Sequence, residues 1–260
     1  MSDLTLTIIQ TPLHWQDAAR NRVMFSELFS KVQQPTAAIL LPEMFSTGFS
    51  MNTSLAETMT GETVTWMKTE AARLNVPIAG SIMISEGDVV VNRFVWMNPD
   101  GTTQQYDKRH LFRMADEHNH FTAGTGKIII NYKGWNICPM VCYDLRFPVW
   151  MRRTTECDYD AIVIVANWPQ RRESHWRALL QARAIENQSY VIAVNRSGAD
   201  GNDIEYSGFS GLISPKGEWI TELAHDSFVQ NVTLQKQEVT DWRTAFPAWQ
   251  DADVFTLREF

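Results

Sequence analysis

The sequence predicts a single α/β domain, with one mixed sheet or two sheets and helices on the outside. Two observations lead to this prediction. Apolar runs at residues 37–41, 160–166 (apolar after its first residue, Asp160) and 190–194 are typical of strands buried on both faces, and segments of helical periodicity lie between them. Elsewhere, turn sequences such as residues 98–101 (NPDG) connect two strand-like runs as a hairpin. Crossover helices and hairpins in one chain indicate a mixed architecture.

Strands and helices alternate in the first half of the chain. The expected strands are residues 4–9, 37–41, 77–84, 89–97 and 102–106. A helix over residues 17–32 follows from apolar side chains at helical spacing, namely Ala18, Phe25, Leu28, Phe29 and Val32. A second helix, over residues 60–74, places Val64, Met67, Ala71 and Leu74 on one face.

The second half begins with residues 114–124, which are polar, end in glycine and have no clear period, so they predict a loop. The expected strands that follow are residues 128–130, 135–141, 160–166, 190–194, 209–213 and 218–223. Residues 173–188 predict a helix with Trp176, Leu179, Leu180 and Ala184 facing inward. Residues 215–217 (PKG) are the turn of a second hairpin.

Length and charge restrict the classes of function. The chain has 260 residues without a low-complexity linker or a long-period repeat, so we expect one domain over residues 1–260. The net charge of −7 argues against nucleic acid or an anionic membrane as a partner. There is no apolar run of membrane-spanning length and no secretory signal, and the three cysteines disfavour a disulfide framework. We therefore expect a cytoplasmic protein that acts on a small molecule.

Four of the expected strands are followed by polar or reactive side chains, which are Glu43, Lys108, Cys142 and Asn167. Ligands of open α/β sheets collect at the carboxyl ends of strands, so a thiol, a carboxylate and an ammonium would share a pocket if these ends converge. A thiol with a pKa of about 8.5 needs a base or a positive neighbour to act as a nucleophile at neutral pH. Taken singly, Cys142 also fits a small buried hydrophobe, and Glu43 and Lys108 also fit solvated charges.

The clearest of these strand ends lies in residues 137–148 (ICPMVCYDLRFP). The run is apolar up to Cys142 and becomes a polar turn before Pro148. Such a turn can present backbone N–H groups to a developing oxyanion beside the thiol. His118 and His120 lie in the expected loop, and their spacing is a weak signal for a base or a metal site.

Three ordered motifs make the chain resemble the nitrilase superfamily of carbon–nitrogen hydrolases. They are residues 41–45 (LPEMF), 106–112 (YDKRHLF) and 141–148 (VCYDLRFP). The resemblance covers nearly the whole chain and implies a four-layer α-β-β-α sandwich without a metal or an organic cofactor. It also implies that Cys142 is the nucleophile, Glu43 the general base and Lys108 the cation that stabilises the oxyanion. By position, Glu117 resembles the second glutamate of the family, which orients the site.

Within this superfamily the chain looks most like the omega-amidases, and residues 246–253 (FPAWQDAD) fit a bacterial branch of 2-oxoglutaramate amidases. The resemblance implies hydrolysis of the terminal amide of 2-oxoglutaramate, or of a similar amide such as 2-oxosuccinamate, through a cysteine thioester. The backbone N–H of Tyr143 is expected to assist Lys108 at the oxyanion. A nitrilase or an N-carbamoyl amidohydrolase would use the same three catalytic residues, and a non-catalytic binding protein of the same fold is a further alternative.

An omega-amidase substrate carries a carboxylate away from its amide, and the site must pair with it. Arg146 is the candidate, because a guanidinium can grip a carboxylate bidentately. The alternative is an internal ion pair of Arg146 with Asp144 or Glu186. Trp168 and Phe45 are expected to form opposite apolar walls of the pocket.

The resemblance implies a homodimer or a larger homo-oligomer. The tail from about Thr240 is rich in aromatic residues, namely Trp242, Phe246, Trp249 and Phe255. These side chains pack either on a partner subunit or on their own subunit, and the sequence favours neither.

Overall fold

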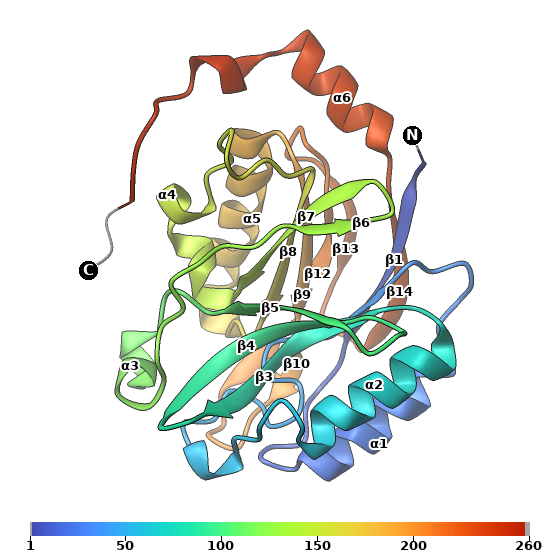
Figure 1. The fold of residues 1–260 in the computed structure, drawn as a ribbon, viewed down its shortest axis with the longest axis vertical. Helices are drawn as coiled ribbons and strands as arrows, with labels where there is room; N and C mark the ends of the chain where they lie inside the picture. Colours follow the sequence, from blue (N-terminus) through green and yellow to red (C-terminus); the bar gives the residue numbers. More distant parts are fainter. Residues whose placement is uncertain (1, 258–260) are drawn as a thin grey trace.

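The structure is a computed structural model and describes residues 2–257. Within these residues two six-stranded sheets lie face to face, and a small hairpin lies beside them (Figure 1). The first sheet contains β14 (Phe228–Leu234), β1 (Leu4–Gln10), β2 (Ile39–Leu40), β3 (Ile78–Glu86), β4 (Val89–Met97) and β5 (Thr103–Asp107), in that spatial order. The second contains β13 (Trp219–Leu223), β12 (Ser210–Ile213), β9 (Tyr190–Asn195), β8 (Ala161–Ala166), β7 (Trp135–Val141) and β6 (Ile130–Tyr132). The hairpin consists of β10 (Ser197–Ala199) and β11 (Glu205–Ser207).

The α-helices lie on the outer faces of the two sheets and at their ends. They are α1 (Ala18–Phe29), α2 (Glu62–Leu74), α3 (Glu117–His120), α4 (Pro148–Met151), α5 (Glu173–Asn187) and α6 (Lys236–Ala245). Short 3-10 turns occur at Thr53–Leu55, Arg113–Ala115, Cys142–Arg146, Gln170–Arg172 and Ala248–Asp251. No helix in residues 2–257 has both the length and the apolar character that a bilayer crossing requires.

Both sheets are mixed, as the sequence predicts. In the first sheet β2 pairs in parallel with β1 and β3, whereas β4, β5 and β14 pair antiparallel with their neighbours. In the second sheet β8 pairs in parallel with β7 and β9, and the outer strands are antiparallel. The carboxyl ends of the parallel strands therefore meet at one edge of each sheet.

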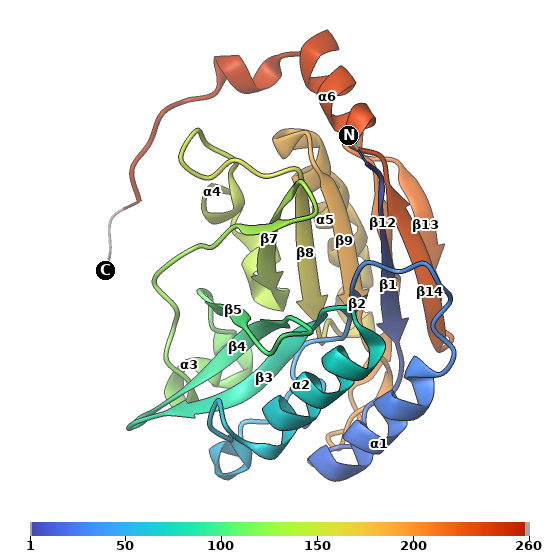
Figure 2. The ribbon, with the colours of Figure 1, turned by 45° about the vertical axis from the view of Figure 1, so that its right-hand side comes forward.

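Two apolar layers hold the sandwich together. The larger one includes Leu6 from the first sheet, Val163 from the second and Leu180 from α5, so it joins the two sheets to each other and to α5. The smaller one lies between the first sheet and the side-by-side helices α1 and α2, where Phe25 is fully buried (Figure 2). Helix α5 covers the outer face of the second sheet. The order helix, sheet, sheet, helix confirms the predicted α-β-β-α sandwich.

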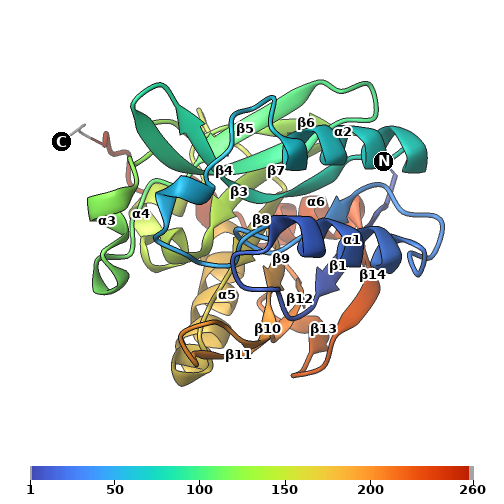
Figure 3. The same ribbon diagram turned by 90° about the horizontal axis from the view of Figure 1, so that it is seen from below.

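The hairpin of β10 and β11 lies beside the start of α5, as the view from below shows (Figure 3). Because it follows β9 directly, it extends one end of the second sheet toward the 3-10 turn Gln170–Arg172. The hairpin thereby brings Tyr206, and Ile204 from its connecting turn, into the wall of the cavity described below.

The structure differs from the sequence prediction in several details, which include the unexpected elements α6, β10 and β11. The expected loop over residues 114–124 contains α3, whose buried first residue, Glu117, is fixed by hydrogen bonds from Lys108 and the Phe112 backbone N–H rather than by helical periodicity. Strand β14 was not predicted, because its sequence FVQNVTL alternates only weakly and its pairing partner β1 is more than 200 residues away. Of residues 37–41 only Ile39–Leu40 form a strand, and β6 begins at Ile130 rather than at residue 128.

The C-terminal segment leaves the body of the molecule after α6. Figure 1 shows it in red, arching away from the sandwich toward the side of α4. Helix α6 itself is anchored, because Val239 is buried and Arg243 donates hydrogen bonds to the carbonyl groups of Gln188 and Tyr159. Beyond it, the side chains of Phe246 and Val254 are exposed.

Candidate active site

Cys142 begins the 3-10 turn that follows β7, so the thiol stands at the carboxyl end of a central strand. Its φ of 44° lies in the left-handed region, which a residue with a side chain adopts at an energetic cost. Such a conformation persists only where the surroundings determine it. It turns the chain sharply enough for the side chain to face the cavity while the backbone stays inside the fold.

The carboxylate of Asp144, which is fully buried, holds this turn. One oxygen accepts the backbone N–H of His110 at 3.0 Å and contacts the imidazole Nδ1 of the same residue at 2.8 Å. The other oxygen accepts the Tyr106 hydroxyl at 2.7 Å and the Val141 backbone N–H at 3.1 Å. Since Tyr106 and His110 flank Lys108, Asp144 ties the lysine segment of the first sheet to the cysteine turn of the second.

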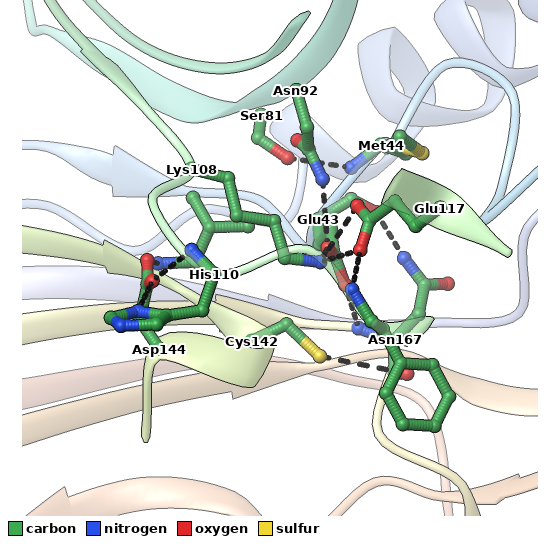
Figure 4. A network of polar contacts seen from close by, with 12 residues as sticks. Glu43, Met44, Ser81, Asn92, Lys108, His110, Glu117, Cys142, Asp144 and Asn167 are labelled. Carbon is green, nitrogen blue, oxygen red and sulfur yellow. Dashed lines mark hydrogen bonds and ion pairs between the residues drawn. The ribbon is translucent and has the colours of Figure 1, made fainter. Parts of the chain in front are cut away.

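The Lys108 ammonium lies between two carboxylates (Figure 4). Its Nζ is 2.9 Å from Oε1 of Glu43 and 2.9 Å from each carboxylate oxygen of Glu117. All three side chains are buried, with 1% of Lys108 and 0% of either glutamate exposed. The structure thus brings together three of the residues that the sequence predicted, and they come from three separate segments.

Neutral donors complete the coordination of the two carboxylates. Oε1 of Glu43 accepts the side-chain amide of Asn92 at 2.8 Å, and Oε2 accepts the backbone N–H of Asn167 at 2.8 Å. Oε2 of Glu117 accepts the backbone N–H of Phe112 at 2.6 Å. Buried charges are costly unless they are paired and hydrogen-bonded, and this arrangement meets both requirements.

The electrostatics keep the thiol protonated and the ammonium charged. Burial and the nearby Glu43 carboxylate raise the pKa of Cys142 well above its ordinary value, and the Lys108 ammonium opposes this rise only in part. Burial alone would lower the pKa of Lys108, but the carboxylates of Glu117 and Glu43 raise it above its ordinary value. A neutral thiol beside a carboxylate needs that carboxylate to accept its proton before the sulfur can attack.

The thiol opens onto a cavity of about 200 Å³. The cavity is lined by Phe49, Lys108, Phe112, Met114, Ala115, Cys142, Tyr143, Arg146, Asn167, Trp168, Pro169, Arg171, Arg172, Ile204 and Tyr206. The walls are mostly aromatic and aliphatic, and the charged groups are arginines and Lys108. This composition suits a small anionic molecule with an apolar middle.

Of the expected substrate contacts, Arg146, Trp168 and the residue next to the nucleophile, Tyr143, line the cavity. The guanidinium of Arg146 lies 4.6 Å from the centroid of the Trp168 ring. Arg146 has no ion pair with Asp144, whose oxygens are occupied by other donors, or with Glu186, which pairs with Arg183 at 3.0 Å. The alternative of an internal ion pair is therefore wrong.

The prediction that Phe45 forms a wall of the pocket is also wrong. Its ring is fully buried on the other side of the first sheet, 5.5 Å from the Phe25 ring and 5.9 Å from the Trp66 ring. In an extended strand, residues 43 and 45 would share one face. Met44 has a φ of 43°, so the chain leaves the extended conformation there and this parity is lost. Phe49 lines the cavity instead, 5.0 Å from the Lys108 ammonium.

Sequence reasoning missed several residues of the site, namely Phe49, Asn92, Asp144 as an anchor, Arg171, Arg172 and Tyr206. Asn92 carried a usable signal, because it and Arg93 are the only polar residues in the apolar strand β4. The two adjacent arginines gave no such signal, since surface arginines are common. His118 and His120 do not line the cavity.

Comparisons with known proteins agree with the fold. The sequence profile of the family described as carbon-nitrogen hydrolase matches residues 5–244. The chain is 46% identical to an omega-amidase, YafV, of Escherichia coli, over 99% of this chain and 100% of that protein. It is 31% identical to a 2-oxoglutaramate amidase of Bacillus subtilis, over 95% of this chain and 96% of that protein.

Solved structures lead to the same family. A CN-hydrolase superfamily protein of Xanthomonas campestris, which carries an arsenic adduct in its active site, superposes with a TM-score of 0.96. It is 41% identical, and the match covers 99% of this chain and 100% of that one. Nit3 of Saccharomyces cerevisiae, a member of the nitrilase superfamily, has a TM-score of 0.84 at 22% identity over 94% of each chain, which supports the fold alone.

The Glu43→Gln variant tests the electrostatics of the thiol. Burial and the Glu43 carboxylate raise the pKa of Cys142 and Lys108 lowers it, so removing the carboxylate removes one of the raising contributions and keeps the lowering one. The midpoint pH for alkylation of Cys142 by iodoacetamide should therefore fall relative to the wild type. Peptide mass spectrometry assigns the label to Cys142 rather than to Cys138 or Cys157.

Glu70→Gln is the matched control for this experiment, because Glu70 is a buried carboxylate of α2 that bonds Arg73 outside the site. Its midpoint should equal that of the wild type. A midpoint that rises or stays unchanged in Glu43→Gln would contradict the proposed interaction between the carboxylate and the thiol.

Proposed function

The chain belongs to the carbon–nitrogen hydrolase family, and we propose that it is an omega-amidase. In this proposal it hydrolyses the terminal amide of 2-oxoglutaramate, or of a similar amide such as 2-oxosuccinamate, to the 2-oxo acid and ammonia. The observation that carries the proposal is the full-length similarity to an omega-amidase, joined to a thiol that shares one cavity with a lysine bound by two carboxylates.

In the first half of the reaction, Glu43 takes the thiol proton while the Cys142 sulfur attacks the amide carbonyl carbon. The negative charge that develops on the carbonyl oxygen is stabilised by the Lys108 ammonium and the backbone N–H of Tyr143. One donor of this kind commonly contributes a factor of about 100 to 1,000 in rate. Glu43 then gives its proton to the nitrogen, the carbon–nitrogen bond breaks, and ammonia leaves a thioester on Cys142.

In the second half, Glu43 removes a proton from a water molecule, which attacks the thioester carbonyl. The carbon–sulfur bond breaks, the proton returns to the sulfur, and the carboxylic acid leaves. The same carboxylate thus serves as base and acid in turn. The donors from Asn92 and Asn167 support this role, since they fix the orientation of the Glu43 carboxylate. Glu117 acts through Lys108, which it holds at 2.9 Å.

The carboxylate of the substrate binds Arg146 in this proposal. The guanidinium is available, because its contacts are the face of the Trp168 ring and His175 Nδ1 at 3.3 Å. Trp168 also supplies an apolar wall for the methylene groups between the amide and the carboxylate. Bidentate binding at one end would place the amide at the other end, toward Cys142.

We also propose that the protein is a cytoplasmic homodimer in which the tail packs on the partner subunit. Free, buried cysteines fit a reducing compartment. In the described chain, the side chains of Phe246 and Trp249 are 54% and 41% exposed, and Val254 is fully exposed. Apolar side chains that gather on one exposed segment commonly mark an interface, and a second copy would cover them.

Cys142→Ala should abolish ammonia release from 2-oxoglutaramate while the circular dichroism spectrum and thermal midpoint stay close to those of the wild type. The nucleophile is lost, but the substitution removes only a sulfur atom at the edge of a cavity. Assaying the wild type with 2-oxoglutaramate, a nitrile and an N-carbamoyl amino acid ranks the reaction classes. Faster turnover of either of the last two would replace the omega-amidase proposal, and residual turnover in Cys142→Ala would remove the nucleophile assignment.

Arg146→Lys should raise the Michaelis constant for 2-oxoglutaramate about tenfold or more and leave that for a neutral aliphatic amide nearly unchanged. Lysine keeps the charge but loses the planar fork and the stacking on Trp168. Arg20→Lys, on the exposed face of α1, is the control and should change neither constant. Equal changes for both substrates would show that Arg146 does not bind the carboxylate.

Truncation after Pro247 should convert the dimer to a monomer in light scattering, because it removes Trp249, Val254 and Phe255 while α6 and its anchor Arg243 remain. Substituting Trp249 and Phe255 together by serine is a milder version of the same test. A dimer that persists in both variants would assign these side chains to their own subunit.

A further inference from the structure

We propose that Arg171 and Arg172 form, with Arg146, a cationic rim that makes the site reject substrates with an α-ammonium group. The site would then take omega-amides of 2-oxo acids and discriminate against omega-amides of 2-amino acids such as glutamine. This inference rests on the proposed omega-amidase function and assigns its selectivity to named residues.

The three arginines line the same cavity as the nucleophile, and they come from two turns at the ends of the second sheet. Arg146 ends the turn that begins with Cys142, and Arg171 and Arg172 lie in the turn that precedes α5. Within the described residues, none of the three has a carboxylate within ion-pair distance, whereas Arg177 and Arg183 pair with Glu222 and Glu186. Three uncompensated positive charges at one cavity are unusual in a chain with a net charge of −7.

The two better-buried guanidiniums rest on aromatic rings that also line the cavity. Arg146 lies 4.6 Å from the centroid of the Trp168 ring, and Arg172 lies 5.0 Å from the centroid of the Phe112 ring. The remaining contact of Arg172 is a weak one, from Nη1 to the Met114 sulfur at 3.7 Å. Aromatic faces hold a guanidinium in position without neutralising its charge, so the donors stay available to a ligand.

The charges of the rim act on one another. Burial lowers the pKa of Arg172, and the positive charges of Arg171 and Arg146 lower it further. The ammonium of Lys108, deeper in the cavity, is paired with two carboxylates, those of Glu43 and Glu117. The uncompensated positive field is therefore concentrated at the part of the cavity away from the carboxylate pair.

This field distinguishes two molecules that are otherwise alike. 2-Oxoglutaramate and glutamine have the same terminal amide and the same carboxylate, and they differ only at the carbon next to that carboxylate. The ketone oxygen accepts a hydrogen bond from a guanidinium, whereas an ammonium has only donors to offer to another donor. Like charges within a few ångströms in a partly buried site repel strongly. This repulsion weakens binding of the amino acid, and it is absent for the oxo acid.

The test separates binding at the rim from turnover. Protection of Cys142 against iodoacetamide is measured with 2-oxoglutarate and with L-glutamate, which differ in the same way and need no hydrolysis. The wild type should be protected at a concentration of 2-oxoglutarate at least tenfold lower than that of L-glutamate. The selectivity ratio is the L-glutamate concentration that gives half-maximal protection divided by the corresponding 2-oxoglutarate concentration. In Arg172→Gln, which keeps a donor but removes a positive charge, this ratio should fall about tenfold or to near unity. A second variant, Arg171→Gln, should lower the ratio in the same direction.

Arg20→Gln is the control, because it removes the same charge from the exposed face of α1 and should leave the ratio unchanged. An unchanged ratio in both rim variants, or equal weakening for both ligands, would overturn the proposal. So would a wild type that is protected equally by both ligands. Failure of the omega-amidase function would be seen separately, as an absence of ammonia release from 2-oxoglutaramate in a wild type that still prefers 2-oxoglutarate as a ligand.

Discussion

The buried ion cluster in which Lys108 binds Glu43 and Glu117 is the constraint on which the site depends. Burying three ionised groups is expensive, and the cost is offset only when every charge is paired and every oxygen has donors. The structure meets this condition with donors from Asn92, Asn167 and Phe112. Because these groups come from both sheets and from α3, the cluster forms only when the whole sandwich has assembled. Folding and active-site formation are in this sense one event.

The second requirement is a thiol that faces this cluster, and Asp144 supplies the link. Its two oxygens bond groups on either side of Lys108 and the strand residue before Cys142. Arg183 of α5 adds a further tie, because its guanidinium donates to the carbonyl oxygen of Leu145 at 2.7 Å. The left-handed conformation of Cys142 is thus imposed by contacts from the opposite sheet and from the covering helix. A strained backbone conformation at a functional residue persists where contacts from neighbouring segments hold it in this way.

The cavity divides its charge into two parts with different effects. At the nucleophile one ammonium lies between two carboxylates, so this end of the cavity carries no excess of positive charge. Toward Arg146 and Arg172 the positive charge has no carboxylate partner within the described chain, so that end favours an anion. The aromatic rings of Phe49, Phe112 and Trp168 line the same cavity and give it an apolar wall. Reactivity and selectivity are therefore assigned to different residues of one small space.

The sequence by itself determined most strands and helices, the mixed pairing and the set Glu43, Lys108 and Cys142. Periodicity and apolar runs report local burial, and reactive side chains at the ends of buried strands predicted a shared pocket. The motif order that resembles the nitrilase superfamily added the four-layer arrangement. Only the tertiary structure decided that Phe49 rather than Phe45 meets the cavity, that Asp144 anchors the turn, and that Arg171 and Arg172 stand beside Arg146. These outcomes depend on the left-handed conformation of Met44 and on contacts between segments far apart in the chain. Neither feature can be recognised from the periodicity of the sequence.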